Sequence, residues 1–267
     1  MKQIIFRNKK ISYKAEGEGK PVILIHGFAE TSEVWLYQLG KLKEKFFVII
    51  PDLPGSGKSE MLEGSVSIDD YAEAIKAIAD AEINNNKPTF FSLIGHSMGG
   101  YITLAFAEKY PELLSGFGLF HSSAYADDDA KKEIRKKGIE FISNNGADAF
   151  TKTTASNLFS EKTKNKRPEL IENLIQIAEG FSGDALVQYY YAMMARPDTT
   201  SVLKNFKKPV LFLIGKDDNA VPLKASLEQC YLPAISFIKI MENSGHMGMW
   251  EQKDEANEFV LNFLKYL

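Results

Sequence analysis

One short stretch, residues 90–100, constrains the fold more than any other part of the sequence. An apolar run, FFSLI, ends abruptly at Gly95, the first residue of GHSMGG, and a helix-forming segment follows. Residues 95–99 fit the pattern G-x-S-x-G, in which a serine occupies a tight turn between a strand and a helix. Gly95 and Gly99 suit this turn because the crowded backbone leaves no room for a Cβ atom there. Ser97 would then project from the strand end, above the free N–H groups of the new helix.

The pattern has only three fixed positions and also arises by chance in turns, so the rest of the chain has to support it. Continuous apolar runs, many of them β-branched, alternate with segments of helical periodicity; the runs are at residues 21–25, 46–50, 117–120, 209–214 and 235–241. Such runs predict strands buried on both faces, as in a parallel sheet. We therefore expect an α/β fold with a mostly parallel, twisted sheet and helices on both of its faces.

The ends of the chain and one internal helix have clear signals of their own. Short strands at residues 3–6 and 10–14 predict an opening hairpin, and apolar residues at helical spacing predict a final helix over 256–267. Ser67 predicts the N-cap of a helix that ends at residues 84–88, NNNKP.

The alternation of strands and helices lapses between residues 124 and 200. Three helical faces are expected there: Ile134, Gly138, Phe141 and Ile142; Ile171, Leu174, Ile175 and Ala178; and residues 185–195. The simplest interpretation is one domain, with residues 1–123 and 201–267 as its core and residues 124–200 as a helical lid inserted after the sixth strand.

Composition narrows the class of protein. The chain has 267 residues and a formal net charge of −3, which argues against a nucleic-acid partner or an anionic membrane surface. Cys230 is the only cysteine, so disulfides within the chain and zinc sites built on cysteine pairs are excluded. The first residues are too briefly apolar for a signal peptide, and no run reaches the roughly 18 apolar residues that span a bilayer. A cytoplasmic location is expected.

Residues 51–59, PDLPGSGKS, contain a segment similar to a phosphate-binding loop. The nucleotide-binding pattern G-x-x-x-x-G-K-[ST] requires a glycine at the position of Asp52, and no helix follows directly. We therefore reject nucleotide binding. Asp52 is expected to accept hydrogen bonds that stabilise this loop.

The residues with catalytic potential fall at the carboxyl ends of the expected strands, where α/β proteins bind ligands. Serine is a weak nucleophile that needs an adjacent base, and the base needs an orienting acid. The chain offers Ser97, Asp218 and His246 in that order, which is the order expected for α/β-hydrolases. Asp217 is the alternative acid.

The combination of motifs resembles the α/β-hydrolase superfamily, in particular its lidded, esterase-like members. The similarity runs over nearly the whole chain. Its motifs are HGF at residues 26–28 with Trp35 downstream, DLPGSGKS at 52–59, GHSMG at 95–99, Gly215-x-x-Asp218, and SGH at 244–246.

The resemblance implies a role for each site residue. Ser97 would be the nucleophile, His246 the general base and then acid, and Asp218 the acid that orients the imidazole. The oxyanion hole would use the backbone N–H groups of Phe28 and Met98. The acid is expected three residues after Gly215, which favours Asp218 over Asp217. No cofactor and no metal are implied.

The expected activity is hydrolysis of a small-molecule ester, lactone or thioester with an apolar moiety, through an acyl-enzyme. The same triad also serves carbon–carbon bond hydrolysis and acyl transfer to another acceptor, and a ligand-binding receptor with vestigial turnover is a further alternative. Some lid side chains are expected to line the apolar site, among Phe141, Phe150, Phe159, Phe181, Tyr189, Tyr190, Tyr191, Met193 and Met194.

The remaining polar candidates have structural alternatives. His26 and His96 are expected to pack behind the oxyanion loop and the serine turn. His121 either faces the pocket or supports a loop, and the second role is favoured. Arg196 either binds a carboxylate or pairs with Asp198.

Overall fold

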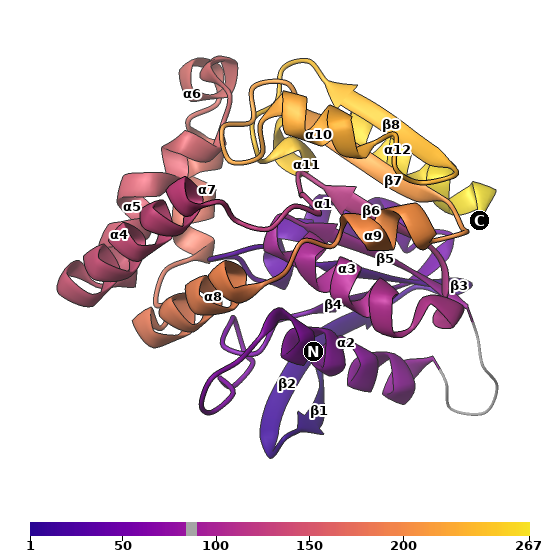
Figure 1. Ribbon diagram of the computed structural model, residues 1–267, viewed down its shortest axis with the longest axis horizontal. Helices are drawn as coiled ribbons and strands as arrows, with labels where there is room; N and C mark the ends of the chain where they lie inside the picture. Colours follow the sequence, from indigo (N-terminus) through magenta and orange to yellow (C-terminus); the bar gives the residue numbers. More distant parts are fainter. Residues whose placement is uncertain (84–89) are drawn as a thin grey trace.

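Eight strands of the described chain form one sheet, whose order in space differs from their order in the sequence (Figure 1). The computed structural model describes residues 1–83 and 90–267, and its sheet order is β1-β2-β4-β3-β5-β6-β7-β8. β2 runs antiparallel to β1 and to β4, and all other neighbours are parallel. The strands are β1 (Lys2–Phe6), β2 (Lys9–Glu16), β3 (Lys20–Ile25), β4 (Phe46–Pro51), β5 (Phe91–His96), β6 (Leu114–Phe120), β7 (Val210–Gly215) and β8 (Ser236–Met241).

The inner parallel strands are buried on both faces, as their continuous apolar sequences predict. Alternate β3 side chains enter two separate apolar clusters, Val22 and Leu24 in one and Ile23 and Ile25 in the other. Helices α2 and α3 pack into the cluster of Ile23, and α1 and α12 into that of Val22 (Figure 1). The core helices are η1 (Ser32–Trp35), α1 (Leu36–Leu42), α2 (Ile68–Glu82), α3 (Met98–Lys109), η2 (Pro111–Leu113), α10 (Leu223–Gln229), α11 (Gly248–Glu251) and α12 (Lys253–Tyr266).

Helix α2 begins as its sequence predicts. The Ser67 hydroxyl accepts a hydrogen bond from the Asp70 N–H, and the Asp70 carboxylate accepts one from the Ser67 N–H. This reciprocal capping box satisfies two N–H groups that a helix start leaves free. The end predicted at residues 84–88 lies outside the described residues.

The segment between β6 and β7 is helical, and most of it lies to one side of the sheet, whereas its last helix packs against α3 (Figure 1). Sequence patterns predicted three helices there and missed the shorter ones, because one or two helical turns carry little periodicity. That this insertion acts as a lid stays a prediction. Its helices are α4 (Asp129–Asn145), α5 (Ala147–Thr154), η3 (Ala155–Leu158), α6 (Glu161–Lys166), α7 (Glu169–Ile177), α8 (Gly183–Ala195) and α9 (Thr200–Asn205).

The inward face of α4 differs from the predicted one. Gly138 and Ile142 are buried, but Ile134 is 68% exposed. The helix packs against α8 so closely that a Cβ atom on Gly138 would lie 2.7 Å from the Tyr190 ring. Arg135 rather than Ile134 turns toward that ring, with its guanidinium carbon 5.7 Å from the ring centroid. The expectation that Ile134 faces inward was therefore wrong.

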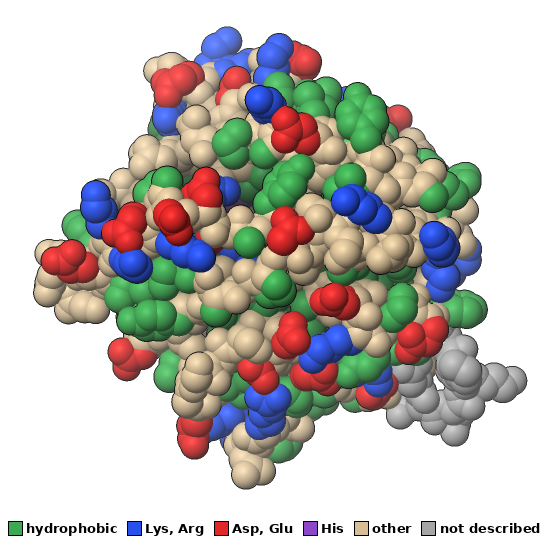
Figure 2. Space-filling model, in the orientation of Figure 1, with side chains coloured by type: hydrophobic (Ala, Val, Ile, Leu, Met, Phe, Trp, Pro, Cys, Tyr) green, Lys and Arg blue, Asp and Glu red, His purple; other side chains and the backbone are tan. Residues whose placement is uncertain are grey.

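The surface carries charges of both signs. Figure 2 shows acidic and basic side chains interspersed over the face of Figure 1. Several form ion pairs, among them Arg7 with Asp70 and Lys76 with Asp80, both at 2.6 Å. In the described part of the chain, no helix combines the length and the apolar character needed to cross a membrane.

Candidate active site

The serine of the GHSMG motif occupies a strained turn between β5 and α3. Ser97 has φ of 50° and ψ of −114°, in a region that side chains rarely occupy. The turn is this tight because two glycines allow it. A Cβ on Gly95 would lie 2.1 Å from the Gly99 carbonyl oxygen, and a Cβ on Gly99 would lie 2.3 Å from the Ile25 carbonyl oxygen. A strained backbone that the fold enforces is typical of a functional position.

Backbone hydrogen bonds hold Ser97 in this conformation. Its N–H donates to the Phe120 carbonyl at 3.0 Å, and its carbonyl accepts the Ser122 hydroxyl at 2.7 Å. The residues on either side, His96 and Met98, are buried, whereas Ser97 is partly accessible. The turn therefore presents one hydroxyl from an otherwise buried segment.

Asp218 and His246, from the loops after β7 and β8, meet in a buried hydrogen bond. His246 Nδ1 lies 2.8 Å from Asp218 Oδ2, and the other carboxylate oxygen accepts the N–H groups of Ala220 and Val221 at 2.8 and 2.9 Å. Asp217 is exposed. The structure thus brings Asp218 rather than Asp217 to the histidine.

The electrostatics of this pair favour an ionised acid and a basic histidine. Burial alone would raise the pKa of Asp218, but the charge of His246 and hydrogen bonds from His121 and His246 hold that pKa far below its ordinary value. Burial alone would lower the pKa of His246, but the Asp218 carboxylate outweighs it, so the His246 pKa lies above its ordinary value. His246 also lies beside the serine turn, with its ring 4.8 Å from the His96 ring.

Two backbone N–H groups near Ser97 have no hydrogen-bond acceptor among the described residues. Within residues 1–83 and 90–267, neither the Phe28 N–H nor the Met98 N–H donates a hydrogen bond. Met98 opens α3, where the helix dipole favours negative charge. Phe28 follows Gly27, whose ideal Cβ position lies 3.1 Å from the Ser97 Cβ, so the two loops approach closely.

Aromatic side chains of the insertion cover the Phe28 loop. The Phe28 ring stacks on Tyr190 with a centroid separation of 4.3 Å and an interplanar angle of 19°. Phe150 and Tyr189 meet the same ring edge-on, at 6.1 and 6.4 Å. Of the aromatic candidates named from the sequence, these three contact Phe28, whereas Phe159 packs in the core and Tyr191 is 57% exposed.

Known proteins match this chain over nearly its whole length. A family model described as "alpha/beta hydrolase fold" matches residues 20–253. The chain belongs to the α/β-hydrolase family. This confirms the predicted family and fold class.

Two curated relatives of this α/β-hydrolase act on acidic substrates according to their names. The 2-hydroxy-6-oxo-6-phenylhexa-2,4-dienoate hydrolase of Comamonas testosteroni is 27% identical, with 96% of this chain and 91% of the relative covered. The (E)-2-((N-methylformamido)methylene)succinate hydrolase of Acinetobacter baylyi is 24% identical, with 97% and 95% covered.

Solved structures show the same fold. A thermophilic esterase from Thermogutta terrifontis, with malate bound, matches with a TM-score of 0.92 and 26% identity, covering 99% of this chain and 97% of the esterase. The enol-lactonase from Burkholderia xenovorans matches with a TM-score of 0.90 and 18% identity, covering 99% and 100%. The second likeness concerns the fold alone.

The other polar candidates of this α/β-hydrolase support loops. His26 Nε2 accepts the Leu53 N–H at 2.9 Å, and burial lowers the pKa of His26. Asp52 accepts the Ser32 and Lys58 N–H groups at 2.8 and 3.0 Å, the loop-stabilising role expected for it.

His121 is the second histidine beside the Asp218 carboxylate. Its Nδ1 lies 3.3 Å from Asp218 Oδ2, and its Nε2 accepts the Gly248 N–H at 3.2 Å. Burial lowers the pKa of His121 to about 4, so the ring is neutral near pH 7. The sequence favoured a role for His121 in supporting a loop, but it did not indicate the contact of His121 with Asp218.

Arg196 binds a carboxylate, but one from within the chain and not that of Asp198. It pairs with buried Asp127 at 3.0 Å and lies over the Tyr101 ring, 3.7 Å from its centroid. Asp198 instead accepts the Thr200 N–H. The pairing with Asp198 was wrong because Asp127, 69 positions earlier, is the carboxylate that the fold places against Arg196.

The insertion also holds the loop that contains His246. The His246 N–H donates to the Leu158 carbonyl at 2.7 Å, and Glu251 accepts the N–H groups of Gly245 and Ser160 at 2.7 and 2.9 Å. The sequence gave no signal for Glu251, a buried acid on a helix of four residues. These contacts tie the helical insertion to the site.

His121, Asp218 and His246 also form a group whose ligand atoms lie within 4.8 Å of one another. Both histidine Nδ1 atoms face the same carboxylate oxygen, at 2.8 and 3.3 Å. This geometry fits hydrogen bonds from the two imidazoles to the carboxylate. That the reaction requires no metal or cofactor stays a prediction.

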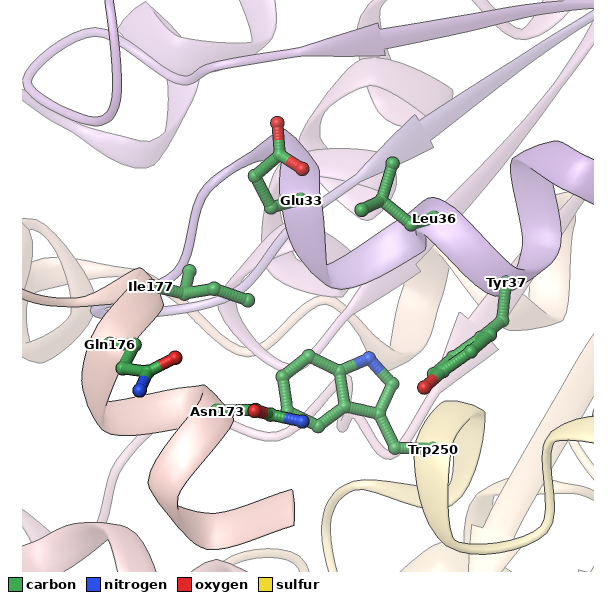
Figure 3. A pocket seen from close by; sticks show the side chains of 7 residues that line it. All are labelled: Glu33, Leu36, Tyr37, Asn173, Gln176, Ile177 and Trp250. Carbon is green, nitrogen blue, oxygen red and sulfur yellow. The ribbon is translucent and has the colours of Figure 1, made fainter. Parts of the chain in front are cut away.

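A separate pocket of about 550 Å³ lies where the insertion meets the core (Figure 3). Leu36 and Tyr37 of α1 face Asn173, Gln176 and Ile177 of α7 across it, with Trp250 at its base; Glu33 completes the lining. Ser97, Asp218 and His246 are not among its lining residues, so this pocket is distinct from the triad.

Proposed function

We propose that this protein is a serine hydrolase that acts on a small-molecule ester, lactone or thioester with an apolar moiety. The observation that carries the proposal is the buried hydrogen bond between Asp218 and His246 beside the strained turn of Ser97. A serine, a histidine and an oriented carboxylate are the groups that acyl transfer needs. The hydrolase names of the relatives support the same class.

The proposed reaction begins with proton transfer. Because Asp218 engages Nδ1 of His246, the free Nε2 takes the Ser97 proton as Oγ attacks the substrate carbonyl. The Phe28 and Met98 N–H groups bind the resulting oxyanion. His246 then protonates the leaving group, and a water activated by the same nitrogen releases the acyl group from Ser97. His246 returns each proton that it takes, so the two steps consume only the substrate and water.

The apolar part of the substrate is assigned to the aromatic group around the oxyanion loop. Phe28, Phe150, Tyr189 and Tyr190 form a continuous set of ring contacts there. Binding of an acyl or alcohol group in place of some of these contacts would be favoured by about 25 cal/mol for each Å² of its apolar surface removed from water. In this proposal the insertion that carries three of the rings acts as the lid.

Carbon–carbon bond hydrolysis is the second candidate. It is favoured by the 27% identity to the Comamonas testosteroni dienoate hydrolase over 96% of this chain. The same three residues and the same oxyanion donors would serve it. A substrate panel containing both p-nitrophenyl esters and a 2-hydroxy-6-oxo-dienoate separates the two, because the preferred class has the higher kcat/KM.

The test of the hydrolase proposal is turnover of p-nitrophenyl esters of increasing acyl length. Ser97→Ala is expected to lower kcat by at least about 1,000-fold. Ser115→Ala, at the opposite end of the strands, is the matched control and should keep the wild-type rate. Equal rates for Ser97→Ala and wild type would refute the serine mechanism, and the absence of wild-type turnover on the whole panel would favour a ligand receptor.

A further inference from the structure

Behind the proposed triad lies a buried pair that its chemistry does not use. Glu30 and His96 are 3% and 0% exposed, and Glu30 Oε2 lies 2.9 Å from His96 Nδ1. The same oxygen accepts the Gly27 N–H at 2.6 Å. On its other side, His96 Nε2 lies 2.9 Å from the His246 carbonyl oxygen.

The partners fix the direction of these hydrogen bonds. A carbonyl oxygen only accepts, so His96 Nε2 donates to His246. Burial alone would raise the pKa of Glu30, but the charge and hydrogen bond of His96 and the Gly27 N–H hold it below its ordinary value. The Glu30 carboxylate is bound by the Gly27 N–H and by His96 Nδ1 through the same oxygen.

The pair joins three segments that are far apart in the sequence. Glu30 holds Gly27, which precedes the proposed oxyanion donor Phe28. His96 precedes the proposed nucleophile Ser97, and the carbonyl that it binds belongs to the proposed base, His246. Burial of an ionisable pair costs free energy unless its hydrogen bonds are satisfied, and here Glu30 Oε2 and both ring nitrogens of His96 have partners.

We infer that Glu30 and His96 are positioning residues, which hold the Phe28 amide and His246 in register with Ser97. The inference rests on the proposed function. Neither residue contacts the reacting atoms, so each acts through the backbone that it binds. A displacement of about 1 Å in such a site lowers the rate on the order of 100-fold, so loss of this positioning should be measurable as a loss of rate.

Two substitutions of His96 separate its two contacts. In His96→Asn the side-chain NH₂ group lies near the place of Nδ1, which keeps the bond to Glu30 and loses the one to His246. In His96→Gln the NH₂ group lies near the place of Nε2, which keeps the bond to His246 and loses the one to Glu30. Glu30→Gln removes the charge at constant shape. Glu82→Gln, at a carboxylate that binds Lys2 and Tyr13, is the matched control.

For an ester whose turnover depends on Ser97, Glu30→Gln and both His96 variants should lower kcat about tenfold or more. KM should stay within about threefold, and a trifluoromethyl ketone, which mimics the oxyanion, should bind more weakly by the factor lost in kcat. The double variant Glu30→Gln/His96→Asn should lose little more than the worse single variant, because the two residues act as one unit. Glu82→Gln should keep the wild-type kcat.

Amide hydrogen exchange tests the positioning without turnover. Glu30→Gln should speed exchange in residues 26–30 and 245–248, and Glu82→Gln should not. The inference is overturned if folded Glu30→Gln and His96→Gln keep kcat within about twofold and exchange in these segments is unchanged. Failure of the proposed function looks different, because Ser97→Ala would then retain turnover whatever the Glu30 and His96 variants do.

Discussion

His246 Nδ1 lies 2.8 Å from Asp218 Oδ2, and both side chains are buried. Because the carboxylate accepts from Nδ1, the opposite nitrogen of the imidazole is left as the base. The second oxygen of Asp218 is held by two backbone N–H groups, so the acid cannot rotate freely. The relationship therefore sets both the tautomer and the orientation of the proposed base.

The two neighbouring aspartates should respond very differently to the same substitution. Asp218→Asn is expected to lower kcat about 10³- to 10⁴-fold, because an amide in place of the carboxylate favours the wrong imidazole tautomer. Asp217→Asn removes an exposed charge and should stay within about twofold of wild type. Ester hydrolysis by the two purified variants measures this, and a larger loss in Asp217→Asn would reverse the assignment.

Activity should fall as His246 becomes protonated, at a pH above the ordinary pKa of histidine. His246 must be neutral to act as a base, and the Asp218 carboxylate raises the pKa of His246 against the effect of burial. The acid limb of kcat/KM is therefore expected at a pH above the ordinary histidine value of about 6.5. In Asp218→Asn the limb should move to lower pH. If kcat/KM of the wild-type protein fell only well below pH 6, the Asp218 carboxylate would not set the pKa of His246.

The first glycine of the serine turn, Gly95, should contribute strongly to the stability of the fold. Gly95→Ala would place a methyl group 2.1 Å from a backbone oxygen of Gly99, so we expect a loss of roughly 3 kcal/mol or more in the free energy of unfolding. Gly40→Ala is the control, at an exposed position in α1 with no atom within 4 Å. It should gain about 0.5–1 kcal/mol. Urea unfolding followed by circular dichroism compares them, and equal stability of Gly95→Ala and wild type would contradict the tight turn.

Sequence patterns predicted the parts of this molecule that are local. The apolar runs became strands because burial on both faces requires an uninterrupted apolar sequence, and Ser97 could be located because its turn demands glycines at fixed spacing. His246 and the pair Asp217 and Asp218 followed from their places after strands, and the resemblance to α/β-hydrolases favoured Asp218. All of these signals lie within a few residues of the feature that they predict.

Contacts between distant segments were not predictable in this way. Glu30 meets His96 across 66 positions, and His121 meets Asp218 across 97. No periodicity or spacing connects such residues, because only the finished sheet brings their strand ends together. The exposure of Ile134 has a similar origin, since the close packing of Gly138 on Tyr190 sets the rotation of α4.

Ser97 is the proposed nucleophile, and covalent labelling can test this assignment without a known substrate. A fluorophosphonate probe should add one adduct mass to the wild-type protein, and peptide mapping should place the adduct on Ser97. Ser115→Ala should label like wild type, and Ser97→Ala should not label. An adduct that persists in Ser97→Ala, or that maps to another residue of the wild-type protein, would show that Ser97 is not the nucleophile.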